Sequence, residues 1–102
     1  MGEPANCLIL TACIAELETL RYTPAGVPVL SLKLEHVSSV TEAGQVRQIK
    51  AIAKAIALGG MAERLAKQAT GSVWKFSGFL ATPRNGKHIV FHIQEFLQDQ
   101  KV

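Results

Sequence analysis

Hydrophobic and polar residues alternate along several short segments of the chain, and this pattern predicts β-strands. The clearest case is residues 30–36, where three leucines alternate with polar neighbours as in a half-buried strand. An apolar stretch at residues 8–20 predicts a first strand. Residues 21–26, which include a proline and a glycine, predict a turn. The polar residues 38–44 are expected to form a loop.

The second half of the chain predicts a short helix followed by a β-hairpin. Residues 61–69 have the spacing of an amphipathic helix, and Gly71 is expected to stop it. Residues 72–81 alternate as a strand, and residues 87–97 predict the strand that returns beside it. Between these two strands, Asn85-Gly86 is typical of a tight hairpin turn.

Residues 46–58 fit two structures. Their isoleucine spacing and many alanines favour a helix. As a strand, the same residues would place small alanines on one face and larger side chains on the other. Periodicity alone leans towards the helix. The overall order of elements nevertheless matches an all-β OB-fold, a five-stranded Greek-key barrel with a short helix between strands 3 and 4.

Length and composition indicate one globular domain. The chain has 102 residues, of which 48% are hydrophobic and 19% charged, and this excludes disordered and fibrous classes. We expect a single domain over residues 1–102 with an ordered core at about 6–97. Cys7 and Cys13 are expected to be buried free thiols, which suits the reducing cytoplasm. No apolar run is long enough to cross a membrane, and the start of the chain lacks the basic residues of a signal peptide.

Charge is distributed unevenly along the chain. Residues 1–42 contain two basic and five acidic residues, whereas residues 43–94 contain eight basic residues and one acidic residue. This asymmetry favours a polyanionic ligand. The candidates for phosphate contacts, three of them at outward-facing strand positions, are Lys33, Arg47, Lys50, Lys54, Lys75, Arg84 and Lys87. Phe79 shares the outward face of Lys75, where it could stack on a base or lie in a dimer interface.

Motifs for catalysis and metal binding are missing from the sequence. It contains no P-loop, no Gly-x-Ser-x-Gly and no evident nucleophile–base pair, so we expect a binding protein without catalytic residues or cofactors. His88 and His92 are four residues apart, which separates them by about 13 Å on a strand. We therefore expect no metal site.

A series of short motifs follows in a fixed order from Asn6 to Leu97. They are Asn6-x-Leu8-x-Leu10, Pro24–Pro28, Leu34–His36, Glu42–Gly44, Gly71-Ser72, Gly78-Phe79, Asn85-Gly86 and Val90–His92. In this order the chain resembles the primosomal replication protein N (PriB) family, small bacterial relatives of single-stranded-DNA-binding protein. The resemblance implies an OB-fold homodimer that binds single-stranded DNA. It also implies work with the helicase PriA, and with DnaT and single-stranded-DNA-binding protein, in reloading the replicative helicase at stalled forks.

The resemblance also has consequences for particular positions. It implies that residues 46–58 form strand three, because an OB barrel cannot close without that strand. It places DNA contacts at Arg21, Arg47, Arg84 and at Lys87 or His88. Family members carry stacking aromatic residues on strand three where this chain has Gln45 and Lys50. We therefore expect phosphate contacts to dominate and binding to be sensitive to salt.

Two isoleucines mark a candidate dimer interface. If the alanines of residues 46–58 face the core opposite Trp74 and Phe76, Ile52 and Ile56 must point outward. Two-fold pairing would cover such a patch, whereas a bulge in the strand would bury one of the isoleucines instead. The alternative for the whole protein is an OB-fold subunit that binds protein or RNA within a larger complex.

Overall fold

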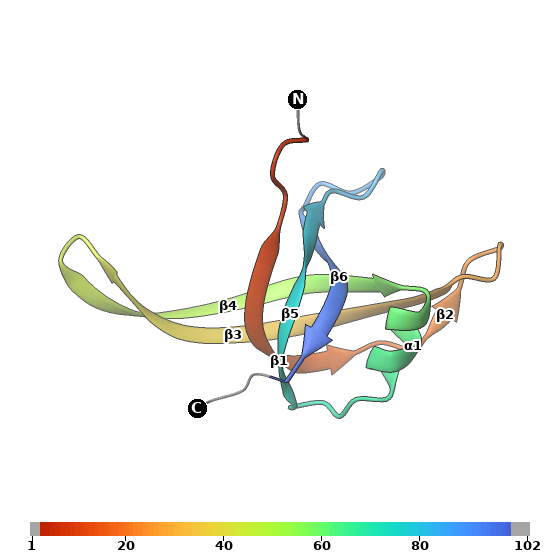
Figure 1. Ribbon diagram of the computed structural model, residues 1–102, viewed down its shortest axis with the longest axis horizontal. Coiled ribbons are helices and arrows are strands. Elements are labelled where there is room, and N and C mark those ends of the chain that lie inside the picture. The colour runs from red at the N-terminus through yellow and green to blue at the C-terminus, as the bar shows by residue number, and fades with distance from the viewer. Residues whose placement is uncertain (1–2, 99–102) are drawn as a thin grey trace.

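The computed structural model describes residues 3–98, which form strands and one short helix (Figure 1). Along the chain the elements are β1 (Leu8–Leu17), β2 (Arg21–Tyr22), β3 (Pro28–Glu42), β4 (Gln45–Leu58), α1 (Gly60–Ala66), β5 (Val73–Ala81) and β6 (Val90–Leu97). The helix lies between β4 and β5, which are strands three and four of the predicted fold.

Five of the strands form a closed ring in the order β1-β5-β6-β4-β3, and pairing between β1 and β3 completes it. All neighbours are antiparallel except β4 and β6, which pair in parallel at Ala55–Phe91 and Ile56–His92. The two-residue β2 pairs with the start of β3 outside the ring. The predicted OB-fold with five principal strands is therefore confirmed.

The inner face of the ring holds the hydrophobic core. The alternation in β3 buries Leu30, Leu32 and Leu34, as the sequence predicts. Beside them on the same face, β4 contributes the small side chains of Ala55 and Ala57, which leave room for the aromatic rings of β5 and β6. Residues 46–58 form a strand, which confirms the strand three that the family resemblance implies. The helix that periodicity alone favours is wrong, because tertiary pairing overrides local propensity.

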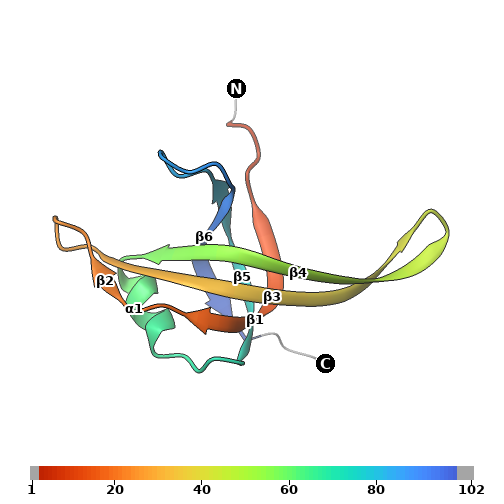
Figure 2. The same ribbon diagram turned by 180° about the vertical axis from the view of Figure 1, so that it is seen from behind.

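Beyond the ring, β3 and β4 continue as a two-stranded hairpin, residues 36–51, that we call the arm (Figures 1 and 2). The pairing register is unbroken from Val29–Leu58 to Glu42–Gln45. The predicted loop at residues 38–44 is wrong, because these polar residues continue the ladder. The turn is formed by Ala43 and Gly44, which have φ of 52° and 78°, as a two-residue type I′ hairpin requires.

The other hairpin differs from its prediction. β6 begins at Val90 and not at residue 87, so residues 82–89 form a longer loop that contains Lys87 and His88. Asn85-Gly86 is not a two-residue hairpin turn, because neither residue has a positive φ. Instead, the Gly86 N–H donates to the Pro83 carbonyl at 2.9 Å and closes a turn within the loop.

Three other boundaries differ from expectation. β1 ends at Leu17, and part of the predicted turn at residues 21–26 forms β2. α1 ends at Ala66, so Gly71 lies in the following connection and does not stop the helix.

Both cysteines are free, but Cys7 is exposed because it precedes β1, and Cys13 is only half-buried, so their predicted burial is wrong.

A bulge in the β5–β6 pair determines which β6 side chains face outward. The register shifts between Ser77 and Gly78, so that one extra β6 residue is accommodated. The chains approach closely here, since a Cβ on Gly78 would lie 1.8 Å from the His92 carbonyl oxygen. Because of the bulge, Ile93 and Phe96 both point into the core, while His92 and Leu97 face outward.

Within residues 3–98, no helix combines the length and apolar character that crossing a membrane requires.

Candidate nucleic-acid interface

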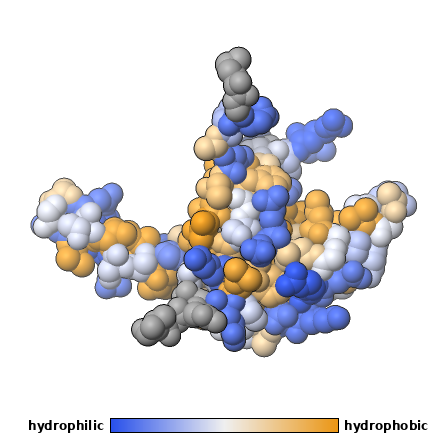
Figure 3. Space-filling model, viewed as in Figure 1, coloured by the Kyte–Doolittle hydropathy of each residue, from blue (hydrophilic) through white to orange (hydrophobic). Residues whose placement is uncertain are grey.

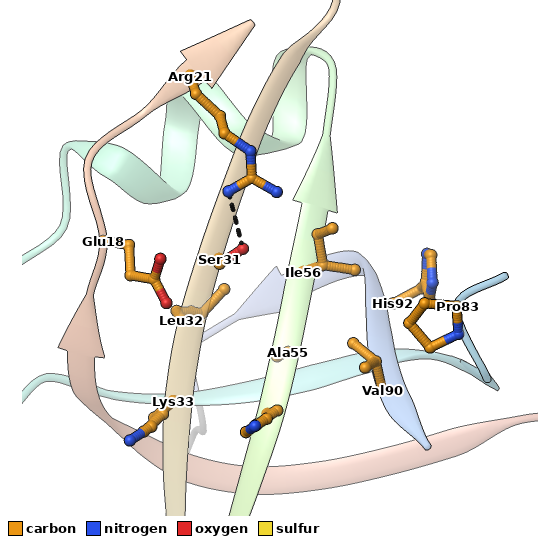
Figure 4. Close-up of a pocket in the computed structure, with 11 residues that line it drawn as sticks. Glu18, Arg21, Ser31, Leu32, Lys33, Ala55, Ile56, Pro83, Val90 and His92 are labelled. Carbon is orange, nitrogen blue, oxygen red and sulfur yellow. Dashed lines mark hydrogen bonds between the residues drawn. The ribbon is translucent and has the colours of Figure 1, made fainter. Parts of the chain in front are cut away.

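A groove of about 420 Å³ lies on the outer face of β3 and β4 (Figure 4). The segment leading into β2 borders one side, and the 82–89 loop with the start of β6 borders the other. Its lining consists of Glu18, Arg21, Ser31, Leu32, Lys33, Lys54, Ala55, Ile56, Pro83, Val90 and His92. OB-folds bind oligonucleotides on this face, between the first and last inter-strand loops.

Two lysines lie directly opposite each other in the groove. Lys33 on β3 and Lys54 on β4 are register partners, so their like charges are adjacent on one face. Lys33 Nζ lies 3.5 Å from a carboxylate oxygen of Glu16, whereas Lys54 forms no ion pair within the described residues 3–98. Opposed like charges destabilise a strand pair. A bound anion would relieve this repulsion.

Arg21 adds a third cation at one end of the groove. Its guanidinium Nη1 donates to Ser31 Oγ at 3.2 Å, which directs the side chain over β3 (Figure 4). The floor between the charged groups is apolar and includes Ile56 and Val90. Besides the carboxylate of Glu18, the groove therefore offers three cations for phosphates and an apolar surface for bases.

An aromatic pair borders the groove on β5 and β6. The Phe79 and His92 rings stack with centroids 4.8 Å apart and planes inclined by 13°. His92 lines the groove and, with Phe79 and Ile56, also a neighbouring depression. Sequence reasoning considered His92 only as a metal ligand. Its position opposite Phe79 in the hairpin is the signal that could have found it.

The predicted cations on the arm lie outside the groove and have acidic partners. Arg47 and Lys50 are three residues apart on β4, so alternation directs them to opposite faces of the arm. Arg47 pairs with Glu42 across the turn, and Lys50 Nζ lies 3.7 Å from a Glu35 carboxylate oxygen.

The remaining predicted cations occupy two places. Arg84, Lys87 and His88 are exposed on the 82–89 loop, whose Pro83 lines the groove. Lys75 is exposed on β5 opposite Leu97, away from the groove. The structure thus brings Arg21, Lys33 and Lys54 together, places the loop cations beside them, and separates Arg47, Lys50 and Lys75.

The two predicted interface isoleucines lie in different surroundings. Ile56 is half-buried in the groove, whereas Ile52 is 56% exposed at the base of the arm. Val37, which is 61% exposed, lies one pair further along the same face. The side chains of Val37 and Ile52 form a small apolar patch beside Lys50.

No group of three or more His, Cys, Asp or Glu side chains suited to hold a metal ion occurs within residues 3–98.

The sequence of this chain is similar to those of known proteins. Residues 6–95 match the model of a family described as another single-strand binding protein family. The chain is 40% identical over 91 residues to replication restart protein PriB of Bordetella pertussis, covering 88% of this chain and 85% of that protein. It is 35% identical over 91 residues to PriB of Nitrosomonas europaea, covering 88% and 84%.

Solved structures show the same arrangement of strands. PriB from Ralstonia solanacearum superposes with a TM-score of 0.85 at 38% identity, over 95% of this chain and 100% of that chain. A deletion mutant of the single-stranded DNA binding protein from Thermus aquaticus superposes with a TM-score of 0.76 at 21% identity, over 94% of this chain and 51% of that chain. The latter likeness concerns the fold alone.

Proposed function

Because this chain belongs to the family of single-strand binding proteins that includes replication restart protein PriB, we propose that it binds single-stranded DNA in the groove during replication restart. The observation that carries the proposal is the apolar-floored groove with three cations, two of them opposed lysines. The protein acts as a binding module, not as an enzyme.

Binding in the groove would depend on phosphates more than on base identity. Arg21, Lys33 and Lys54 can pair with successive phosphates, and the exposed cations of the 82–89 loop can extend the contact. Phosphate contacts position a strand without reading its sequence. Bases would then lie against the apolar floor near the His92 ring.

The biological setting extends this proposal. As one domain working in the cytoplasm, the protein would cooperate with the helicase PriA, with DnaT and with single-stranded-DNA-binding protein. Its task would be to stimulate PriA and help reload the replicative helicase at stalled forks. Support comes from the curated relatives, which are named replication restart proteins.

A homodimer is part of the proposal, and the apolar patch of Ile52 and Val37 is its candidate contact. Exposed β-branched side chains of this kind favour burial against a second copy. Ile52→Glu should convert the dimer into folded monomers, measured by analytical ultracentrifugation with circular dichroism. Val46→Glu, at a 75% exposed valine near the arm turn, is the matched control and should remain dimeric. Ile56 is less suitable because it also lines the groove.

The proposed activity is tested by titrating fluorescently labelled oligothymidylate and an equal-length duplex at two salt concentrations. We expect preference for the single strand and weaker binding at high salt. Equal or stronger binding to the duplex would overturn the proposal. A hairpin RNA titrated in the same way tests the alternative, and its preferred binding would instead favour an OB-fold subunit of a larger complex.

A further inference from the structure

Another hollow, which shares no lining residue with the groove, lies where the end of α1 approaches the start of β5 and the end of β6. It has a volume of about 400 Å³, and its lining includes Arg64, Lys67, Gln68, Trp74, Phe96 and Leu97. None of the candidate DNA-binding residues lines it. The face that carries α1 is rich in hydrophilic side chains (Figure 3).

We propose that this hollow is a second contact site for single-stranded DNA, in which a base stacks on Trp74 and the adjoining phosphates pair with Arg64 and Lys67. The inference rests on the proposed function, since it concerns the same ligand. It adds a place on the protein that a longer strand reaches after leaving the groove.

Trp74 is held in a fixed orientation at the wall of the hollow. Its indole Nε1–H donates to Ser72 Oγ at 2.9 Å, and its ring meets Phe96 edge-on with centroids 5.0 Å apart. The side chain follows the alternation of core residues but remains only partly buried. A ring held in this way loses little conformational entropy when a base stacks on it.

The charge of the hollow suits a phosphate. The Arg64 guanidinium lies 5.0 Å from the Phe96 ring centroid, which orients it beside the aromatic wall. Neither Arg64 nor Lys67 forms an ion pair within residues 3–98, and no acidic residue is among the lining residues. A cationic rim beside an aromatic ring is the arrangement by which single-stranded nucleic acids are bound without sequence preference.

The β5–β6 pair connects the hollow with the groove. His92 lines the groove and Leu97 lines the hollow, five residues or about 17 Å further along β6. Both face outward, as do their β5 partners Phe79 and Lys75. Lys75, which lies outside the groove, is the partner of Leu97 and therefore lies at the end of this face that borders the hollow.

Trp74 is the only tryptophan of the chain, so its fluorescence reports on the hollow directly. The test uses oligothymidylates of about 5 and about 20 nucleotides, near the lower end of and beyond the roughly 4–16 that one OB-fold covers. We expect the longer strand to quench Trp74 strongly and the shorter strand, which fills the groove first, to quench it weakly. Anisotropy of a label on the oligonucleotide measures total binding in parallel.

The double variant Arg64→Gln/Lys67→Gln should bind the longer strand about fivefold more weakly and the shorter strand like the parent. Its salt slope for the longer strand should be smaller by about 1.4, because two phosphate contacts are lost. The control Lys54→Ala should weaken binding of both lengths and retain the Trp74 quench at saturation. The quench in the parent tests the site even where a variant fails to fold.

Three results would overturn the inference in distinguishable ways. Binding of the longer strand without any change in Trp74 fluorescence would exclude the hollow as a DNA contact site and leave the groove as the proposed site. Quenching by a polyglutamate peptide but not by either oligonucleotide would identify the site as one for an acidic protein partner. Failure of the parent to bind any oligonucleotide would overturn the proposed function itself.

Discussion

One ladder of paired residues, β3 with β4, has two halves with different surroundings. In the ring, its inner face is buried against the core and includes Leu32 and Ala55. In the arm, residues 36–51 continue the same register, and none of them, all within the described chain, is fully buried. Unbroken strand pairing therefore does not require a buried face, and the two halves must be stabilised differently.

The two halves also differ in how their charges are arranged. On the arm, Arg47 and Lys50 each have a carboxylate partner. In the ring half, Lys33 pairs with Glu16, but Lys54 directly opposite it has no ion pair within residues 3–98. Cations already paired with carboxylates have less to gain from a phosphate. We therefore expect most of the affinity for DNA to come from the ring half.

The largest effect expected concerns stability. Leu32→Ala should lower the free energy of unfolding by roughly 2–5 kcal/mol, because it removes a fully packed side chain from the ring half. Val46→Ala in the arm should change it by no more than about 0.5 kcal/mol. Urea denaturation followed by circular dichroism measures both. Equal losses would show that the arm contributes to the cooperative core.

The next effect concerns affinity in the groove. Lys54→Ala should weaken binding of single-stranded oligothymidylate about tenfold, equivalent to roughly 1.4 kcal/mol. It should not lower stability, because it removes one of two opposed like charges. Fluorescence anisotropy and a thermal melt test the two statements. A loss of fold together with binding would assign Lys54 a structural role.

A smaller effect on affinity is expected on the arm. Lys50 is a matched comparison for Lys54, because both are lysines on the same face of β4. Lys50→Ala should weaken binding only about two- to threefold, since its pairing with Glu35 limits what a phosphate can add. The reduction should be similar for oligonucleotides of different sequence. If Lys50→Ala weakens DNA binding as much as Lys54→Ala does, the arm and the groove contribute equally to affinity and the comparison does not hold.

The smallest effect is a change in salt dependence. We expect the parent to have a log–log slope of about −2 to −4, and each phosphate contact removed to reduce its magnitude by about 0.7. Lys54→Ala should therefore flatten the slope measurably, and Arg84→Ala should do so to a similar or lesser extent. A parent slope near zero would contradict electrostatic binding altogether.

Sequence patterns predicted β3 of the ring half well, leaned wrongly towards a helix for β4, and missed the arm. Alternation is visible where Leu30, Leu32 and Leu34 must face a core, but residues 38–44 face solvent on both sides and carry no such constraint. Turn chemistry was similarly ambiguous. Asn85-Gly86 has the stronger hairpin composition, yet the two-residue turn forms at Ala43 and Gly44, because the β3–β4 register positions it there.

The candidate site was predictable in its chemistry and less so in its assembly. The alternation of side chains along β3 correctly predicted that Lys33 points away from the core, and Lys54 lies opposite it. His92 could have been found from its position opposite Phe79, but the contribution of Ser31 could not be derived, since it depends on how β2 and the 82–89 loop border the same face. Such long-range placement follows from ring closure and leaves no local signature in the sequence.

The measurement that tests the central claim most directly is a titration of the ¹⁵N-labelled protein with a short oligothymidylate, followed by amide chemical shifts. We predict that the largest shifts occur at groove residues of β3 and β4, including Ser31, Lys33, Lys54 and Ile56, and that the arm residues near Gly44 shift little. Shifts concentrated on the arm, with the groove unchanged, would contradict the account.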